Sequence, residues 1–92
     1  MGKEIRLFKS EERHSRSEVC QFLRQLADKI ESGQVVLRQG QEELTLAIPT
    51  NVFLEVQVEN EDKKTKGMQH SLEIEIKWFD NEGARGPLEL AE

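Results

Sequence analysis

The segment from Ser71 to Trp78 alternates apolar and polar side chains without interruption, and no other feature constrains the fold as strongly. A strict period of two is typical of a β-strand with one face on a core and the other in water. Similar alternation runs over residues 43–48 and 52–59. We therefore expect a largely antiparallel sheet. The apolar face of the last strand would carry Leu72, Ile74, Ile76 and Trp78.

A helix is predicted from Arg16 to Ser32. Ser15 stands before it and Glu18 lies three residues later, which is the spacing of a capping box. Gly33 follows at the position of a left-handed C-cap. The apolar residues recur at helical spacing and form one face, which consists of Val19, Phe22, Leu23, Leu26, Ala27 and Ile30.

The remaining patterns complete an α+β fold. Residues 3–8 predict a short first strand, because Ile5 and Leu7 alternate with polar neighbours. Val35 and Leu37 precede a turn at Gly40, and residues 60–67 read as a charged loop. We expect a two-layer sandwich with one amphipathic helix on a mainly antiparallel sheet of four to five strands, in the order β-α-β-β-β-β. The position of the first strand in the sheet is left open.

The length of 92 residues allows one domain. We expect it to occupy residues 1–79, because residues 80–92 lack hydrophobic periodicity and contain Gly, Pro and acidic residues. Such a composition predicts a flexible acidic tail.

The net charge of −5 limits the possible partners. Residues 1–38 carry a net +2 and residues 39–92 a net −7. An acidic chain without a basic cluster does not favour binding to nucleic acid or to anionic membranes. The single cysteine excludes an internal disulfide and suits the cytoplasm. No apolar run approaches the ~18 residues of a membrane span.

Several of these motifs together resemble the amphi-Trp domain, a small prokaryotic family. The matching residues are Ser15 to Glu18, Phe22-Leu23, Leu26-Ala27, Ile30, Gly33, Ile48-Pro49 and Leu72 to Trp78. The resemblance covers about residues 4–79 and departs from the pattern at Cys20, where a small residue is expected. It supports the fold prediction and implies no established biochemical activity.

Two surfaces are candidate sites. The first is an acidic outer face formed by Glu55, Glu59, Glu73 and Glu75. Like charges that face each other across strands are unfavourable, so a divalent cation or a basic partner would explain them. The simpler interpretation, which we favour, is a solvated face that keeps the protein soluble and discourages edge pairing. The second surface is an aromatic patch for a partner, made of Phe8, Phe53 and Phe79, which are out of phase with the apolar rows.

Other chemically active residue types form no recognisable set. Trp78 is in phase with the apolar row and is expected to be a structural anchor. Cys20 lies near His14 in sequence, yet no third group orients a nucleophile. The two histidines do not show metal-ligand spacing. We therefore predict neither catalytic nor metal residues, and no cofactor.

These observations favour a non-catalytic domain for protein interaction or oligomerisation, with a protein partner or a second copy as its ligand. The alternative is binding of a small ligand or a divalent cation through the acidic outer face.

Overall fold

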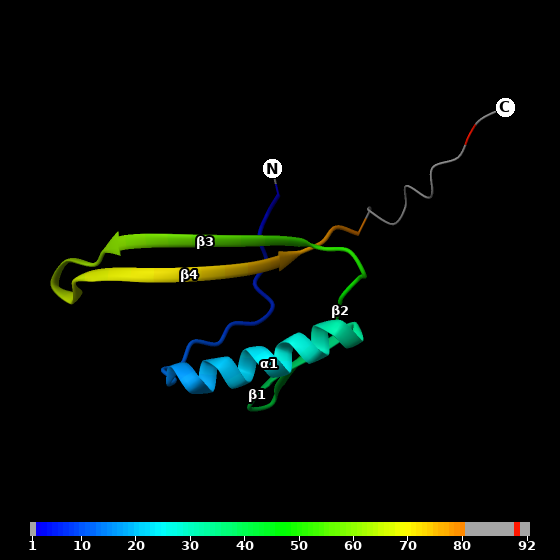
Figure 1. The fold of residues 1–92 in the computed structure, drawn as a ribbon, viewed down its shortest axis with the longest axis horizontal. Coiled ribbons are helices and arrows are strands. Elements are labelled where there is room, and N and C mark those ends of the chain that lie inside the picture. The colour runs from blue at the N-terminus through cyan, green and yellow to red at the C-terminus, as the bar shows by residue number, and fades with distance from the viewer. Residues whose placement is uncertain (1, 81–89, 91–92) are drawn as a thin grey trace. The chain divides into compact units, whose positions relative to one another are not determined.

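The computed structural model describes residues 2–80 and residue 90. The chain divides into two compact units, residues 1–50 and residues 51–92, and each is described by itself. The first unit contains helix α1 (Arg16–Ser32) and strands β1 (Gln34–Gln39) and β2 (Glu42–Ala47). The second contains β3 (Phe53–Asp62), the short 3₁₀ helix η1 (Lys64–Lys66) and β4 (Met68–Lys77) (Figure 1).

Helix α1 begins and ends where the sequence predicts. The Glu18 backbone N–H donates to Ser15 Oγ at 3.1 Å, and the Ser15 N–H donates to Glu18 Oε1 at 2.8 Å. This is a complete capping box. At the other end Gly33 has φ +91°, and its N–H donates to the Ile30 carbonyl. Both ends of the helix are thus fixed by local hydrogen bonds.

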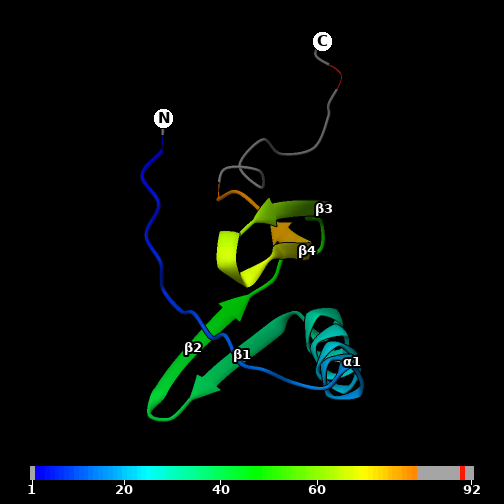
Figure 2. The same ribbon diagram turned by 90° about the vertical axis from the view of Figure 1, so that its left-hand side faces the viewer.

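Strands β1 and β2 form an antiparallel hairpin, and α1 packs against β1 (Figure 2). Gln39 pairs with Glu42, which leaves Gly40 and Gln41 as a two-residue turn. Gly40 has φ +60°, a conformation that glycine adopts without steric cost. Val35 on β1, only 4% exposed, is the one buried hydrophobic side chain in the described part of the chain.

The first predicted strand is not formed. Residues 3–8 belong to an irregular segment that runs past the end of β1 to the start of α1 (Figure 2). Ile5 and Leu7 are 76% and 67% exposed. A strand is defined by a ladder of hydrogen bonds to a neighbour, and the alternation of residues 3–8 could not show whether a neighbour exists.

Strands β3 and β4 form a long antiparallel hairpin that continues past the predicted end of the strand pattern. Asn60, Glu61 and Asp62 pair with His70, Gln69 and Met68, so part of the expected loop over residues 60–67 is strand. Polar residues can extend a ladder once its register is set. The connection shrinks to residues 63–67, where Lys64 and Gly67 have positive φ angles of 60° and 87°.

The α+β class and the antiparallel strand pairing are confirmed. Among the described residues, β1 pairs with β2 in the first unit and β3 pairs with β4 in the second. The expected flexible tail lies outside the described residues, apart from Asp80 and Leu90.

Candidate functional site

The β3-β4 hairpin has a continuous apolar face. Its register places three apolar pairs in consecutive rows along one side: Leu54 with Ile76, Val56 with Ile74, and Val58 with Leu72. We call these six side chains the apolar face. Five of them, Leu54, Val56, Val58, Leu72 and Ile74, are 56–71% exposed, and Ile76 is half-buried. A contiguous apolar surface of this kind is typical of an interaction site.

The opposite side of the same hairpin is acidic, as the alternation predicts. Glu55 pairs directly with Glu75, Gln57 pairs with Glu73, and Glu59 pairs with Ser71. The expected repulsion between Glu55 and Glu75 is relieved by a neighbouring cation. Lys77 Nζ lies 3.0 Å from Glu55 Oε1 and 3.7 Å from Glu75 Oε1.

This arrangement affects what the acidic face can bind. The hydrogen bond and the charge of Glu55, with a smaller contribution from Glu75, raise the pKa of Lys77 above its ordinary value. The ammonium therefore occupies the place between the two carboxylates that a cation would need. Within residues 2–80 and 90, no group of three or more His, Cys, Asp and Glu side chains is arranged to hold a metal ion.

Two of the three predicted patch aromatics meet. The rings of Phe53 and Phe79 have centroids 5.9 Å apart at an interplanar angle of 82°, an edge-to-face pair. Both are more than 45% exposed. Phe8 belongs to the other unit, so its convergence with them stays a prediction. Trp78 follows β4 directly and is half-buried; its role as an anchor also stays a prediction.

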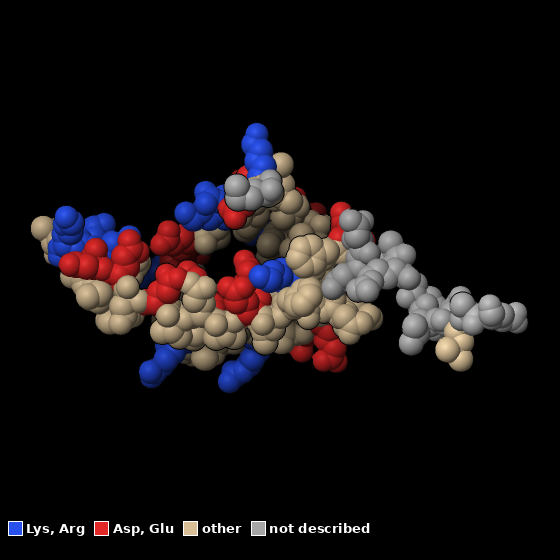
Figure 3. Space-filling model, turned by 90° about the horizontal axis from the view of Figure 1, so that it is seen from above, with Lys and Arg blue, Asp and Glu red and all other residues tan. Residues whose placement is uncertain are grey.

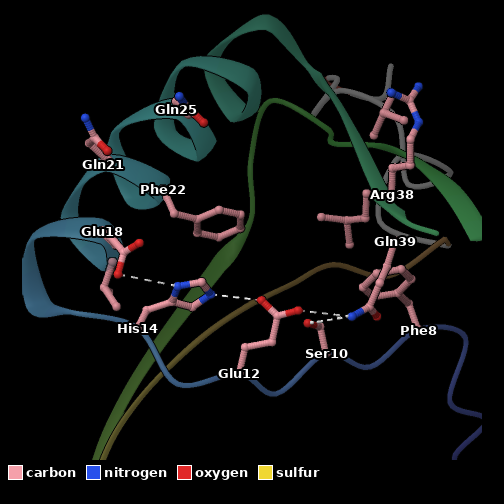
Figure 4. Close-up of a pocket in the computed structure, with 13 residues that line it drawn as sticks. Phe8, Ser10, Glu12, His14, Glu18, Gln21, Phe22, Gln25, Arg38 and Gln39 are labelled. Carbon is pink, nitrogen blue, oxygen red and sulfur yellow. Dashed lines mark hydrogen bonds and ion pairs between the residues drawn. The ribbon is translucent and has the colours of Figure 1, made fainter.

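The first unit contains a pocket that no sequence pattern predicted (Figure 4). It has a volume of about 730 Å³ and is bounded by the N-terminal segment, the first half of α1 and the end of β1. Phe8 and Phe22 supply aromatic walls. The other lining residues are Ser10, Glu12, His14, Glu18, Val19, Gln21, Gln25, Val36, Leu37, Arg38 and Gln39.

A chain of polar contacts crosses this pocket from α1 to β1 (Figure 4). His14 lies 3.8 Å from Glu18 and 2.9 Å from Glu12. Gln39 Nε2 donates to Glu12 Oε2 at 3.3 Å and to Ser10 Oγ at 3.5 Å. These contacts tie the N-terminal segment to both elements. Because the polar groups already bind one another, the chain of contacts is best explained as a tether for the segment.

Glu18 connects this tether to the helix cap. The Ser15 N–H, then the Ser15 hydroxyl and more weakly His14, lower the pKa of Glu18 below its ordinary value of 4.5. A lowered folded-state pKa means that the ionised carboxylate stabilises the folded state above the unfolded pKa. That stabilisation is lost as the pH falls through the folded pKa.

We expect Glu18→Gln to isolate this contribution, because glutamine also suits the third position of a capping box but does not titrate. The variant should melt at a lower temperature than the wild type at pH 7, and the gap should close near pH 3. Thermal denaturation followed by circular dichroism at both pH values measures it. A gap that is the same at both pH values would show that charge is not involved.

The remaining candidates stand apart from these surfaces. Cys20 is exposed on α1. His70 Nδ1 lies 2.7 Å from Asn60 Oδ1, across the hairpin. Lys63 pairs with Glu61 at 3.3 Å in the loop region. No described helix is long and apolar enough to cross a membrane.

Comparison with known proteins identifies the family. Neither curated proteins nor solved structures give a match to this chain. The sequence profile of the Amphi-Trp domain, in contrast, matches residues 1–91, which extends beyond the predicted boundary at residue 79. The capping box, the glycine C-cap and the amphipathic last strand that leads into Trp78 are features that the chain shares with this family. The chain belongs to the Amphi-Trp domain family.

Proposed function

We propose that this domain is a non-catalytic oligomerisation module, and that the apolar face of the β3-β4 hairpin is its binding surface. The observation that carries the proposal is the exposure of Leu54, Val56, Val58, Leu72 and Ile74 in one uninterrupted patch. The single cysteine suits the reducing cytoplasm. The acidic net charge does not favour a nucleic-acid partner.

The free energies of burial and of association are compatible with a dimer of moderate affinity. Complete burial of an aliphatic side chain stabilises by roughly 1.5–3 kcal/mol, and these five are already partly covered, so each would contribute roughly 1–2 kcal/mol. Two copies together would gain on the order of 10–20 kcal/mol. Association costs an estimated 4–15 kcal/mol in lost freedom. The midpoints of these two ranges leave roughly 5 kcal/mol, which corresponds to a dimer with a dissociation constant on the order of 100 μM.

The acidic outer face is a weaker candidate for the binding surface. Lys77 contacts both Glu55 and Glu75 there, so a cation would have to displace an ammonium group already held by two carboxylates. A flat strand face also supplies few of the oxygen ligands that Ca²⁺ or Mg²⁺ requires.

The experiment is a measurement of mass against concentration by light scattering coupled to size exclusion. We expect the mass to rise from 10.6 kDa towards twice that value as the protein concentration increases past about 100 μM, and to fall again upon dilution, because the dissociation constant is expected to be of that order. A mass of 10.6 kDa at every concentration would overturn the proposal, and would mean that the apolar face is covered in another way.

A further inference from the structure

We propose that residues 8–14 form a strap that closes over the pocket of the first unit, and that protonation of His14 holds this strap closed. The inference does not depend on the proposed oligomerisation, because every residue that carries it belongs to the first unit. The structural feature that carries it is the position of the His14 imidazole between two carboxylates (Figure 4).

Both ring nitrogens of His14 face carboxylate oxygens. Nε2 lies 2.9 Å from Glu12 Oε1, and Nδ1 lies 3.8 Å from Glu18 Oε1. Ionised carboxylates only accept hydrogen bonds, and a neutral imidazole has a single N–H. In the neutral form, one nitrogen would therefore direct its lone pair at an oxygen. The imidazolium has an N–H on each nitrogen, so this geometry matches the charged form of His14.

The other charged groups that line the pocket do not oppose this charge. The Ser15 N–H and hydroxyl, and more weakly His14, lower the pKa of Glu18, so its carboxylate stays ionised near neutral pH. From β1, Arg38 also lines the pocket, but its guanidinium pairs with Glu43 of β2 at 2.8 Å. The two carboxylates are thus the charges available to a protonated imidazole.

The contact between His14 and Glu12 is linked to closure of the strap. Glu12 uses its second oxygen to accept from Gln39 Nε2 of β1 at 3.3 Å, and Gln39 also donates to Ser10 Oγ. Glu12 therefore joins the imidazole at the start of α1 to β1 on the other side of the pocket (Figure 4). Phe8, at the beginning of the strap, is half-buried and forms part of the pocket wall. Opening the strap removes this wall.

The direction of the pH dependence follows from linkage. His14 binds its proton more tightly when the strap is closed, because opening separates the imidazole from Glu12. The closed form is therefore favoured as the pH falls from 8 to 5, the range in which histidine becomes charged. An exposed ion pair shifts an equilibrium by roughly 1.4- to 5-fold. With both pairs charged, the ratio of closed to open strap should rise by roughly 2- to 25-fold.

The test uses the full chain with Cys20→Ser and Lys9→Cys, labelled with a nitroxide at this exposed position of the strap. The electron spin resonance spectrum separates slowly and rapidly moving labels. We expect the ratio of slow to rapid labels to rise by roughly 2- to 25-fold from pH 8 to pH 5.5. With His14→Gln added, the ratio should be the same at both pH values, because glutamine donates to a carboxylate but does not titrate. An unchanged ratio in the presence of His14, or an equal rise with His14→Gln, would overturn the proposal.

His70→Gln in the labelled chain is the matched control. His70 Nδ1 lies 2.7 Å from the amide oxygen of Asn60 and belongs to the second unit. It lies near the loop whose lysines, Lys63, Lys64 and Lys66, are gathered at the left of Figure 3. This variant should keep the full pH dependence, and its loss would overturn the assignment to His14. Both histidines are exposed, so we expect both variants to fold, and circular dichroism at the two pH values checks this.

Discussion

Replacing Val56 with lysine should abolish self-association. Val56 is in the central row of the apolar face and is 59% exposed, so each copy would bring a charge into the middle of the contact. An unpaired charge removed from water costs several kcal/mol, and each 1.4 kcal/mol weakens binding about tenfold. We therefore expect the dimer to weaken at least about 100-fold, and light scattering should show a monomer at about 100 μM.

Gln57→Lys is the matched control, because it adds the same charge one residue later. Gln57 faces the acidic side of the hairpin, where it donates to Glu59 and pairs with Glu73. A lysine is readily accommodated there, and the mass should stay that of the wild type. Equal effects of the two variants would show that net charge, and not the apolar face, controls association. Circular dichroism would establish that both variants remain folded.

Replacing Gly33 with valine should destabilise the first unit strongly. Gly33 connects α1 to β1 with φ +91°, which a β-branched residue adopts only under strain. Its carbonyl also accepts from the Ile48 N–H at 2.8 Å, so a shifted backbone would disturb the end of the hairpin as well. We expect a cost of about 1–3 kcal/mol and a melting temperature roughly 5–15 °C lower.

Gly33→Asn separates backbone strain from the simple addition of a side chain. Asparagine tolerates the left-handed region better than other residues and occurs at helix C-caps. A Cβ at this position would lie 3.8 Å from the Ile48 carbonyl oxygen, an ordinary contact. The asparagine variant should therefore lose much less stability than the valine variant. Equal losses would point to crowding as the cause.

The parts of the fold that depend on local chemistry could be predicted from the sequence. Helix α1 has the predicted bounds because the signals at both ends, Ser15 with Glu18 and Gly33, act within a few residues. The first predicted strand, over residues 3–8, was wrong because a strand requires pairing with another segment, which alternation alone does not show. The hairpin loop was predicted too long because the ladder continues through Asn60 to Asp62, which have no strand signal of their own.

The candidate sites also differ in how far they could be predicted from the sequence. The meeting of Phe53 with Phe79 and of Glu55 with Glu75 followed from antiparallel pairing across one hairpin. The pocket beside His14 could not be predicted in this way, because its walls come from three segments of the chain and depend on where an irregular segment lies. The only sequence signal for it was the cluster of polar residues before α1, which is equally common in simple connections.

The two-stranded nature of the β3-β4 sheet has a consequence for how large an assembly can become. Contact through edges would be open-ended, since each added strand offers a new edge and growth leads to fibres. Contact through the one apolar face is satisfied after two copies, because the reverse sides are covered with Glu55, Glu59, Glu73 and Glu75 and repel each other. The acidic side would then limit the assembly: it stops growth at a pair and keeps the exposed strands from becoming the start of an aggregate.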